Sequence, residues 1–488
     1  MDVQEFINGL EILNTSYPSP HTILGVANDS REVKEGYAFV AVKGYTSDGH
    51  NFIKDAIRNG ASLIIGEESS HSLSVPYIQV KNSRKALGIL ACNFYQTNQS
   101  TKKFIGVTGT NGKTTTTYII HYLLKECGIS SSLIGTIENV INGEASQSTN
   151  TTPDSLELHR MIASSHDDVI VMEVSSHGLS QDRLEGIEFD IGVFTNLEQE
   201  HLDYHGSMEE YFNTKFQLFE KLKDYGVAVI NVESSWGEKV EEQLIHSNKK
   251  VITVGLSTSS TIQLVKTEDC LPSDVYIRED FERSKFHFTM PGIHNLINAT
   301  LSYGVARSIG LNKQQIYEGL QSFTGVNGRF EIYATSNGAT VVIDYAHTAE
   351  AFFHCLTTAK QCGAKKITHI FGFRGDRDQK KRPEMLSVSS ELSHHIILTL
   401  DDLNSVPQDE MTAYLKEQQQ NIQSASTDVI PDRTLAIKKA MESASKEDWV
   451  FITGKGHERY KQTFSLSTNS DRETVEYVLA IKEKGVQK

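Results

Sequence analysis

Short runs of apolar residues alternate with amphipathic stretches along most of the chain. Four runs in its central part have the length of a strand: 104–107, 168–173, 191–194 and 226–231. Near-continuous apolar runs of this kind are typical of parallel strands that are buried on both faces of a sheet. The stretch from Tyr118 to Leu124 instead has its apolar positions at helical spacing. The pattern therefore predicts an α/β protein built on parallel sheets.

The same alternation continues on either side of this central part. On the N-terminal side, strands are expected at 37–42, 62–66 and 75–80, and helices at 52–59 and 84–95. On the C-terminal side, strands are expected at 340–344, 367–372, 395–399 and 449–453. Ser83 is placed to cap the helix that starts at residue 84.

The chain of 488 residues is too long for one hydrophobic core, and its length favours about three domains. The polar stretch 96–103 has the composition of a linker. We predict three α/β units, at residues 1–98, 99–328 and 329–488.

Composition and charge narrow the class of protein. The net charge of −15 argues against nonspecific binding to nucleic acid or to a membrane surface. No apolar run approaches the ~20 residues that cross a bilayer, and the N-terminus is acidic where a signal peptide would be basic. The five cysteines include no C-x-x-C pair and give no metal-site signature. We expect a cytoplasmic protein without nucleic-acid partners or membrane insertion.

The best-defined motif follows the apolar run at 104–107. It reads Gly109-Thr-Asn-Gly-Lys-Thr114 and leads into the predicted helix. Strand, glycine-rich turn and helix form the setting of a phosphate-binding loop, in which backbone N–H groups and a lysine hold phosphate and a hydroxyl reaches Mg²⁺. The strict motif would have a glycine where Val107 stands, so a glycine-rich turn that binds nothing is the alternative. The Gly-Lys-Thr sequence favours a nucleotide site with Lys113 and Thr114.

Polar residues also follow two later apolar runs. Glu173 ends one of them, and the stretch 195–205 after the next contains His201. Because ligands of open α/β sheets lie at the carboxyl ends of the strands, these two side chains are candidate Mg²⁺ ligands beside the nucleotide loop. Mg²⁺ prefers oxygen, so the histidine would be the unusual member. Each residue could instead be only a helix cap or a loop anchor.

Several motifs, in order along the chain, resemble those of the Mur ligase family. Those of the central part are Gly109–Thr114, Glu173–His177, His201–His205 and Gly292–Asn298. Those of the C-terminal part are Asp344–Thr348, Gly375–Asp378 with Lys381–Pro383, and Gly454–Glu458, while Asp29–Arg31 and Asp48–His50 lie in front. The resemblance covers essentially the whole chain. It is closest to the branch of the family that adds the third residue of the peptidoglycan stem peptide.

The resemblance implies an N-terminal α/β UDP-binding domain, a central P-loop-type parallel-sheet ATPase domain and a C-terminal Rossmann-like α/β domain that binds the amino acid. It also implies a monomeric, ATP-dependent ligase that requires Mg²⁺ and acts on UDP-N-acetylmuramoyl-L-alanyl-D-glutamate and a free amino acid. The D-glutamate side-chain carboxylate would attack the γ-phosphate of ATP, giving an acyl phosphate and ADP. The amine of the amino acid would then displace phosphate. Cations and backbone donors are needed because both partners of the first step are anions.

The family motifs imply roles for individual residues of this sequence. The implied catalytic residues are Lys113, His201 and Lys215, and the implied metal ligands are Thr114, Glu173, His201 and, if carbamylated, Lys215. The implied ATP contacts are Gly109, Thr110, Asn111, Gly112, Lys113, Thr114, Thr115, Asn298, Arg329 and Asp344. The implied sugar-nucleotide contacts are Ser30, Asn150, Thr151, Thr152, Ser175, Gln181 and Arg183, and those of the amino acid are Arg377, Asp401, Asn404, Gly454 and Glu458. For Lys215 the alternative is an ordinary exposed helix lysine.

The motif that selects the amino acid departs from the family. Diaminopimelate-adding members carry Asp-Asn-Pro-Arg and lysine-adding members end the same motif in a small residue, whereas the positions here read Asp401-Asp-Leu-Asn404. Asn404 cannot form the charge-assisted pair that an arginine makes with a carboxylate. Phe373 and Arg374 stand in what is usually a glycine turn, and Arg374 is a candidate replacement for the missing clamp. The sequence therefore predicts an altered choice of amino acid or a paralogue, and not lost ATP chemistry.

Three further functions are open from the sequence. A Mur-like ligase of another pathway, such as a folylpolyglutamate synthase, would use another acceptor, but those enzymes lack the domain that carries Asp29–Arg31. A non-catalytic nucleotide-binding paralogue would be expected to lose Lys113, Glu173, His201 and Lys215 first, and all four are present. A plain P-loop kinase would leave the C-terminal motifs unexplained.

Overall fold

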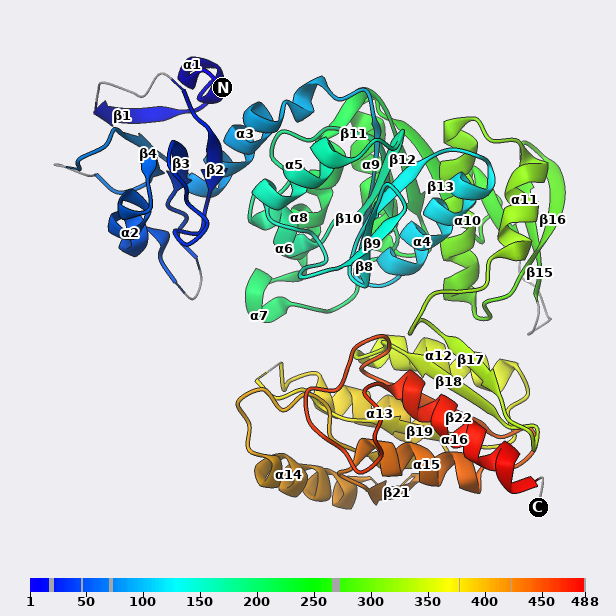
Figure 1. Cartoon of the computed structure of the whole chain (residues 1–488). Coiled ribbons are helices and arrows are strands. Elements are labelled where there is room, and N and C mark those ends of the chain that lie inside the picture. Colours follow the sequence, from blue (N-terminus) through cyan, green and yellow to red (C-terminus); the bar gives the residue numbers. More distant parts are fainter. Residues whose placement is uncertain are drawn as a thin grey trace.

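The computed structural model describes residues 1–16, 22–44, 47–69, 73–265, 273–376, 378–422 and 424–486. These residues form three sheets of five, eleven and six strands, with helices packed on each (Figure 1). The predicted α/β class is confirmed. Each sheet falls within one of the three units expected from the sequence, whose exact boundaries stay a prediction.

The first sheet has the strand order β1-β5-β4-β3-β2. Its strands are β1 (Ile12–Ser16), β2 (Gly25–Ala27), β3 (Tyr37–Val40), β4 (Ala61–Gly66) and β5 (Tyr77–Val80), and the helices of this unit are α1 (Val3–Phe6), η1 (Gly49–Phe52), α2 (Ile53–Arg58), α3 (Ser83–Tyr95) and η2 (Thr97–Gln99). The predicted cap of α3 is wrong. Asn82 caps the helix, since its Oδ1 accepts hydrogen bonds from the N–H groups of Arg84 and Lys85. Ser83 donates to the adjacent Glu67 carboxylate instead.

The central sheet is the largest, with the order β16-β15-β14-β13-β12-β11-β6-β10-β7-β8-β9. Its strands are β6 (Lys103–Thr108), β7 (Ser131–Ile134), β8 (Glu138–Ile141), β9 (Glu144–Gln147), β10 (Val169–Glu173), β11 (Phe189–Phe194), β12 (Leu222–Asn231), β13 (Lys250–Gly255), β14 (Ile262–Val265), β15 (Ser273–Glu279) and β16 (Glu282–Phe288). Across the sheet from β14 to β7, in the order given above, each strand pairs in parallel with its neighbours, as the apolar runs predicted. Antiparallel hairpins, β8–β9 and β15–β16, extend the two edges of the sheet.

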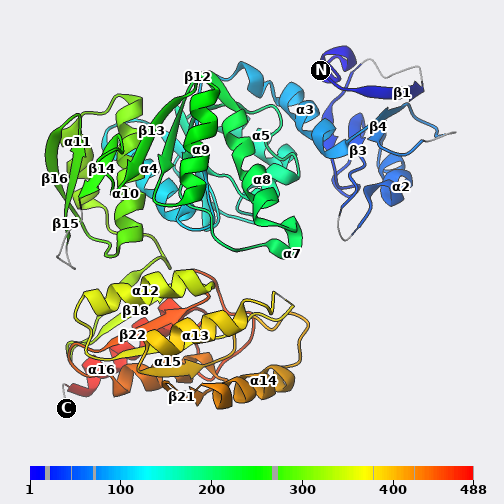
Figure 2. The same ribbon diagram turned by 180° about the vertical axis from the view of Figure 1, so that it is seen from behind.

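Helices cover both faces of this sheet. They are α4 (Lys113–Glu126), α5 (Ser155–Ser164), α6 (Ser176–Ser180), α7 (Leu202–His205), α8 (Met208–Glu220), α9 (Ser235–His246), α10 (Ile293–Ile309) and α11 (Lys313–Ser322). Successive residues of β6 point to opposite faces: Phe104 belongs to the apolar cluster that includes α8, and Ile105 to the one that includes α4. Accordingly α4 and α10 lie on one face and α8 and α9 on the other (Figures 1 and 2).

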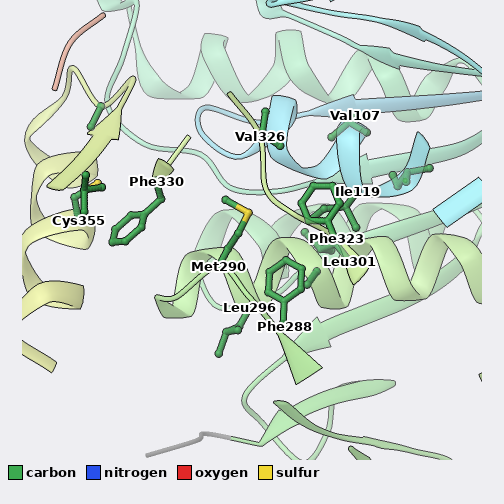
Figure 3. Close-up of a cluster of buried hydrophobic side chains, with 14 of the residues drawn as sticks. Val107, Ile119, Phe288, Met290, Leu296, Leu301, Phe323, Val326, Phe330 and Cys355 are labelled. Carbon is green, nitrogen blue, oxygen red and sulfur yellow. The ribbon is translucent and has the colours of Figure 1, made fainter. Parts of the chain in front are cut away.

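The C-terminal sheet has the order β17-β18-β22-β19-β20-β21, with only β17 antiparallel to its neighbour. Its strands are β17 (Glu331–Ala334), β18 (Thr340–Asp344), β19 (Ile367–Phe371), β20 (His395–Leu398), β21 (Ser426–Val429) and β22 (Trp449–Thr453), and its helices α12 (Ala349–Gln361), α13 (Arg382–Leu392), α14 (Gln408–Asn421), α15 (Arg433–Ser443) and α16 (Asp471–Val486). One apolar cluster runs from the central unit into this one, through Met290, Val326 and Phe330 (Figure 3). No helix within the described ranges combines the length and apolar character needed to cross a membrane.

Candidate active site

A cavity of about 670 Å³ lies between the central and C-terminal units. Its walls include the loop before α4, the ends of β10 and β11, the start of α10 and the segment between β18 and α12. It brings together most residues for which the sequence predicted a role: Thr110, Asn111, Gly112, Lys113, Thr114, Thr115, Asn150, Thr151, Thr152, Glu173, Ser175, Gln181, Arg183, His201, Lys215, Asn298, Arg329 and Asp344. Ser30 lies outside it, buried in the first unit.

The loop before α4 has the geometry of an anion cradle. Gly109 and Gly112 have φ values of +146° and +83°, which favour glycine. A Cβ on either residue would collide with the side chain of Thr195 or Asn298. Lys113 curls back over the loop, its Nζ donating to the carbonyls of Gly109 at 2.8 Å and Thr110 at 2.7 Å. With the positive end of α4 behind it, this loop fits a polyphosphate.

Oxygen ligands suited to a hard cation sit beside the loop. The buried Glu173 carboxylate accepts hydrogen bonds from Thr114 Oγ1 at 3.1 Å and from the N–H and hydroxyl of Thr136 at 2.8 and 2.9 Å. Arg329 of the C-terminal unit donates to the same Thr114 oxygen at 3.3 Å. A hydroxyl paired with a carboxylate at a phosphate cradle fits Mg²⁺ in its ligand chemistry.

Lys215 is buried, with 1% of its surface exposed, so it is not an ordinary exposed helix lysine. Its Nζ donates to the Gly109 carbonyl at 2.8 Å and lies 4.6 Å from the centre of the Tyr211 ring. Desolvation, with the neighbouring Lys113 in second place, holds the pKa of Lys215 well below its ordinary value. Its environment therefore favours the uncharged, nucleophilic amine.

His201 lies at the mouth of the cavity, and 41% of its side chain is exposed. It has a φ of +56°, and its ring is 4.9 Å from that of His177. Within the described residues, sets of three or more His, Cys, Asp or Glu ligands within 4.8 Å of one another are Asp48–His50–Glu68 and Glu198–Glu350–His354. Neither set contains His201 or Glu173, so a second metal at these residues stays a prediction.

Two carboxylates after β11, Glu198 and Glu200, contact the C-terminal unit at the start of α12 and just before it. No role was predicted for either from the sequence. Glu200 Oε1 pairs with His347 Nε2 at 3.0 Å across the boundary. Desolvation opposes ionisation of Glu200, yet the hydrogen bond from His347 holds its pKa below the ordinary value. Glu198 accepts a hydrogen bond from Asn111 of the phosphate loop and faces Glu350 of α12. The polar stretch 195–205, which directly follows the buried strand β11, was the feature of the sequence that could have pointed to these carboxylates.

Burial, together with the nearby Glu350 carboxylate, raises the pKa of Glu198 to about 8. A carboxyl with a raised folded-state pKa contributes its stability below the unfolded pKa and loses it as pH rises through the folded value. The contribution of Glu198 to stability should therefore be lost between about pH 4.5 and 8, and Glu198→Gln should remove that loss. We expect the variant to exceed wild type in Tm by about 2 °C or more near pH 9, with little difference near pH 5.

Thermal unfolding of both proteins across this range measures the effect. The exposed Glu238→Gln on α9 serves as the control and should follow wild type. An identical pH profile for Glu198→Gln and wild type would contradict the assignment.

Four of the residues predicted for the sugar nucleotide, Thr152, Ser175, Gln181 and Arg183, form one hydrogen-bonded group. Arg183 donates to the Thr152 carbonyl at 2.6 Å and to Gln181 Oε1 at 2.9 Å. Thr152 in turn donates to the Glu173 carbonyl at 2.9 Å, and Ser175 caps α6. This group lines the same cavity as the phosphate loop, and Glu173 bonds to both Thr152 and Thr114.

Three of the residues predicted for the amino acid, Asp401, Gly454 and Glu458, lie outside the cavity, on the far side of Tyr345. Tyr345 lines the cavity and donates to Glu458 Oε1 at 3.1 Å. Asp401 and Gly454 gather beside Glu458 around Arg374, which lies 3.8 Å from Asp401. Asn404 does not reach this group, because its Nδ2 donates to the Gly375 carbonyl at 2.6 Å. Arg377 lies outside the described residues.

Three family models match the chain in order. The Mur ligase family catalytic domain matches residues 22–95, the Mur ligase middle domain 107–306 and the Mur ligase glutamate ligase domain 328–456. The UDP-N-acetylmuramoyl-L-alanyl-D-glutamate–2,6-diaminopimelate ligase of Fusobacterium nucleatum is 38% identical over 443 residues, 89% of each chain. The Clostridium botulinum protein of the same name is 38% identical over 466 residues, 92% of this chain and 94% of its own.

Solved structures agree with this relationship. A structure of UDP-N-acetylmuramoyl-L-alanyl-D-glutamate–2,6-diaminopimelate ligase has a TM-score of 0.70 and 26% identity over 99% of both chains. MurF of Thermotoga maritima, solved with ADP, has a TM-score of 0.66 at 21% identity over 95% of this chain and 97% of its own, a likeness of fold. The extent and identity of these matches lead to one conclusion: the chain belongs to the Mur ligase family.

Proposed function

We propose that this protein is an ATP-dependent ligase that joins an amino acid to the D-glutamate of UDP-N-acetylmuramoyl-L-alanyl-D-glutamate. The relatives described above are named for this reaction with 2,6-diaminopimelate as the amino acid. The proposal rests on the observation that the phosphate loop, Lys215 and the Arg183 group all line the same cavity. The reaction would serve peptidoglycan precursor synthesis, and through it cell-wall growth, cell shape and cell division.

The first chemical step brings two anions together. A carboxylate oxygen of the acceptor attacks the γ-phosphorus of ATP, the bond to the β-phosphate oxygen breaks, and ADP leaves. Lys113 and the loop N–H groups hold the β- and γ-phosphates, while Asn298, Arg329 and Asp344 contact the rest of the nucleotide. Because these groups are fixed before the reaction, they neutralise the repulsion without reorganising. Thr114 would hold one Mg²⁺, which would offset further negative charge.

In the second step the amine of the amino acid attacks the acyl carbon, the C–O bond to phosphate breaks, and the amine loses a proton. The Arg183 group keeps the peptide end of the acceptor beside the phosphate loop. Tyr345 lies between that end and the residues proposed to bind the incoming amino acid. We propose that Glu173, His201 and a carbamylated Lys215 hold a second Mg²⁺. Carbamylation would turn a cation into an anionic oxygen ligand, which is the chemistry that Mg²⁺ requires.

We also propose a division of labour among the three units. Residues 1–98 would bind the UDP end through Ser30, residues 99–328 would bind ATP, and residues 329–488 would bind the amino acid through Arg377, Asp401, Gly454 and Glu458. The protein would act as a monomer in the cytoplasm.

Release of phosphate from ATP tests the function. We expect release only when Mg²⁺, UDP-N-acetylmuramoyl-L-alanyl-D-glutamate and a suitable amino acid are all present. Release that depends on another acceptor, such as a folate, would identify a paralogue of different specificity. No release with any acceptor would favour a non-catalytic nucleotide-binding protein.

A further inference from the structure

Arg374 already donates to the two acceptors, Glu458 and Gly454, that would otherwise be available to the ammonium group of a ligand. It follows β19, and its Nη2 donates to Glu458 Oε2 at 2.6 Å and to the Gly454 carbonyl at 3.0 Å. Glu458 and Gly454 are the two acceptors at this end of β22 to which an amino acid is proposed to bind. A side chain of the protein therefore already supplies the cation that a ligand ammonium would bring to them.

A second cation shares the same acidic group. Lys455, buried with 1% of its surface exposed, donates to Asp402 Oδ1 at 2.6 Å and lies 3.7 Å from Asp401 and 3.8 Å from Glu458. Lys461 pairs with Asp402 at 3.2 Å from the other side. Each of the three carboxylates thus has at least one cation within 4 Å, and the cluster carries no unpaired negative charge.

One N–H group of Arg374 has no hydrogen-bond partner among the described residues. It is the buried Nε–H, with Asp401 Oδ1 at the longer distance of 3.8 Å. A buried donor without a partner costs free energy, which an acceptor on a ligand would recover. Asn404 does not supply that acceptor; its side chain donates to the Gly375 carbonyl.

We propose, on the basis of the function above, that Arg374 determines specificity: the protein takes amino acids whose side chain ends in a hydrogen-bond acceptor and carries no ammonium group. An ammonium brought to Glu458 would face Arg374 and Lys455 with no carboxylate left for it, and juxtaposed like charges are strongly disfavoured. Carboxylate or carboxamide oxygens would instead be attracted by these two cations. The selection works by repulsion of the wrong ligand as well as attraction of the right one.

Matched pairs of amino acids test this directly. The pair 2-aminopimelate and 2,6-diaminopimelate differs by one distal ammonium, and so does the pair norleucine and lysine. We expect wild type to favour the member without the ammonium by at least about tenfold in kcat/KM, since one like-charge contact typically exceeds that factor. Arg374→Gly frees Glu458 and Gly454 and should reverse the preference. Arg374→Lys keeps the charge and should retain it.

Calorimetric binding of the same four amino acids separates this inference from the proposed function. A preference in binding without phosphate release would support the role of Arg374 and contradict the ligase. Arg472→Ala, which removes a surface ion pair with Glu331, is the control and should leave every ratio unchanged. Thermal unfolding checks that each variant is folded, and Arg374→Gln, which also removes the charge, replaces Arg374→Gly if that variant is not folded. A wild type that prefers the diamino member, a folded Arg374→Gly or Arg374→Gln with the wild-type ratio, loss of the preference in Arg374→Lys, or no binding of any of the four would overturn the inference.

Discussion

Lys113→Ala is expected to lower kcat for ATP-dependent phosphate release by about a hundredfold to a thousandfold, which is typical when one preorganised electrostatic contact is removed. The Lys113 Nζ is held over the phosphate loop by the carbonyls of Gly109 and Thr110. Desolvation lowers its pKa, and the nearby Glu173 carboxylate opposes that shift. A cation in this half-buried place is worth more to a phosphate than one in water. Initial rates of phosphate release with saturating acceptor measure the loss.

Lys125→Ala is the matched control, because this exposed lysine ends the same helix, α4. It should keep wild-type rates. Near wild-type turnover by Lys113→Ala would mean that the loop does not hold the reacting phosphates.

Lys215→Ala is expected to have an effect of similar size, about a hundredfold or more. Lys215 Nζ lies 2.8 Å from the Gly109 carbonyl, so any group built on it reaches the phosphate loop. Its lowered pKa leaves an amine that can react with CO₂, forming an N–C bond with loss of a proton. Isotope-labelled bicarbonate and NMR should reveal a carbamate signal in wild type that is absent in the variant.

Lys221→Ala provides the comparison at the end of the same helix, where Lys221 pairs with Glu185 at 3.3 Å on the surface. It should change neither the carbamate signal nor the rate. A wild type that is fully active with bicarbonate and CO₂ excluded would contradict carbamylation, and full activity of Lys215→Ala would remove the residue from the mechanism altogether.

Much of the fold could be predicted because its central strands are buried on both faces. The sequence runs that form β10, β11 and β12 are apolar over most of their length. This pattern is typical of a parallel strand that is buried on both faces of its sheet. The edge hairpins were missed because their strands are half exposed and polar; all four residues of β9 are exposed. The cap of α3 was misassigned by one residue, since Asn82 and Ser83 are both good caps and only the nearby Glu67 decides between them.

The phosphate loop could likewise be located from the sequence, because strand, glycines and lysine are contiguous. Contacts between units could not. The pairing of Glu200 with His347 spans 147 residues and depends on how two separate sheets pack together. The pairing of Arg374 with Glu458 arises because β19 and β22 are neighbours, although three helices and two strands lie between them in the chain. Sequence reasoning proposed Arg374 as a carboxylate clamp but could not see that it already holds a carboxylate.

In the proposed reaction the acceptor carboxylate itself takes the phosphoryl group within this cavity. Labelling the D-glutamate side-chain carboxylate of the acceptor with heavy oxygen, and following the label by mass spectrometry during turnover, tests this step. Transfer of one labelled oxygen to inorganic phosphate for each amide formed is the predicted result. Unlabelled phosphate, with the displaced labelled oxygen found in water or with both labelled oxygens still on an unreacted carboxylate, would contradict it.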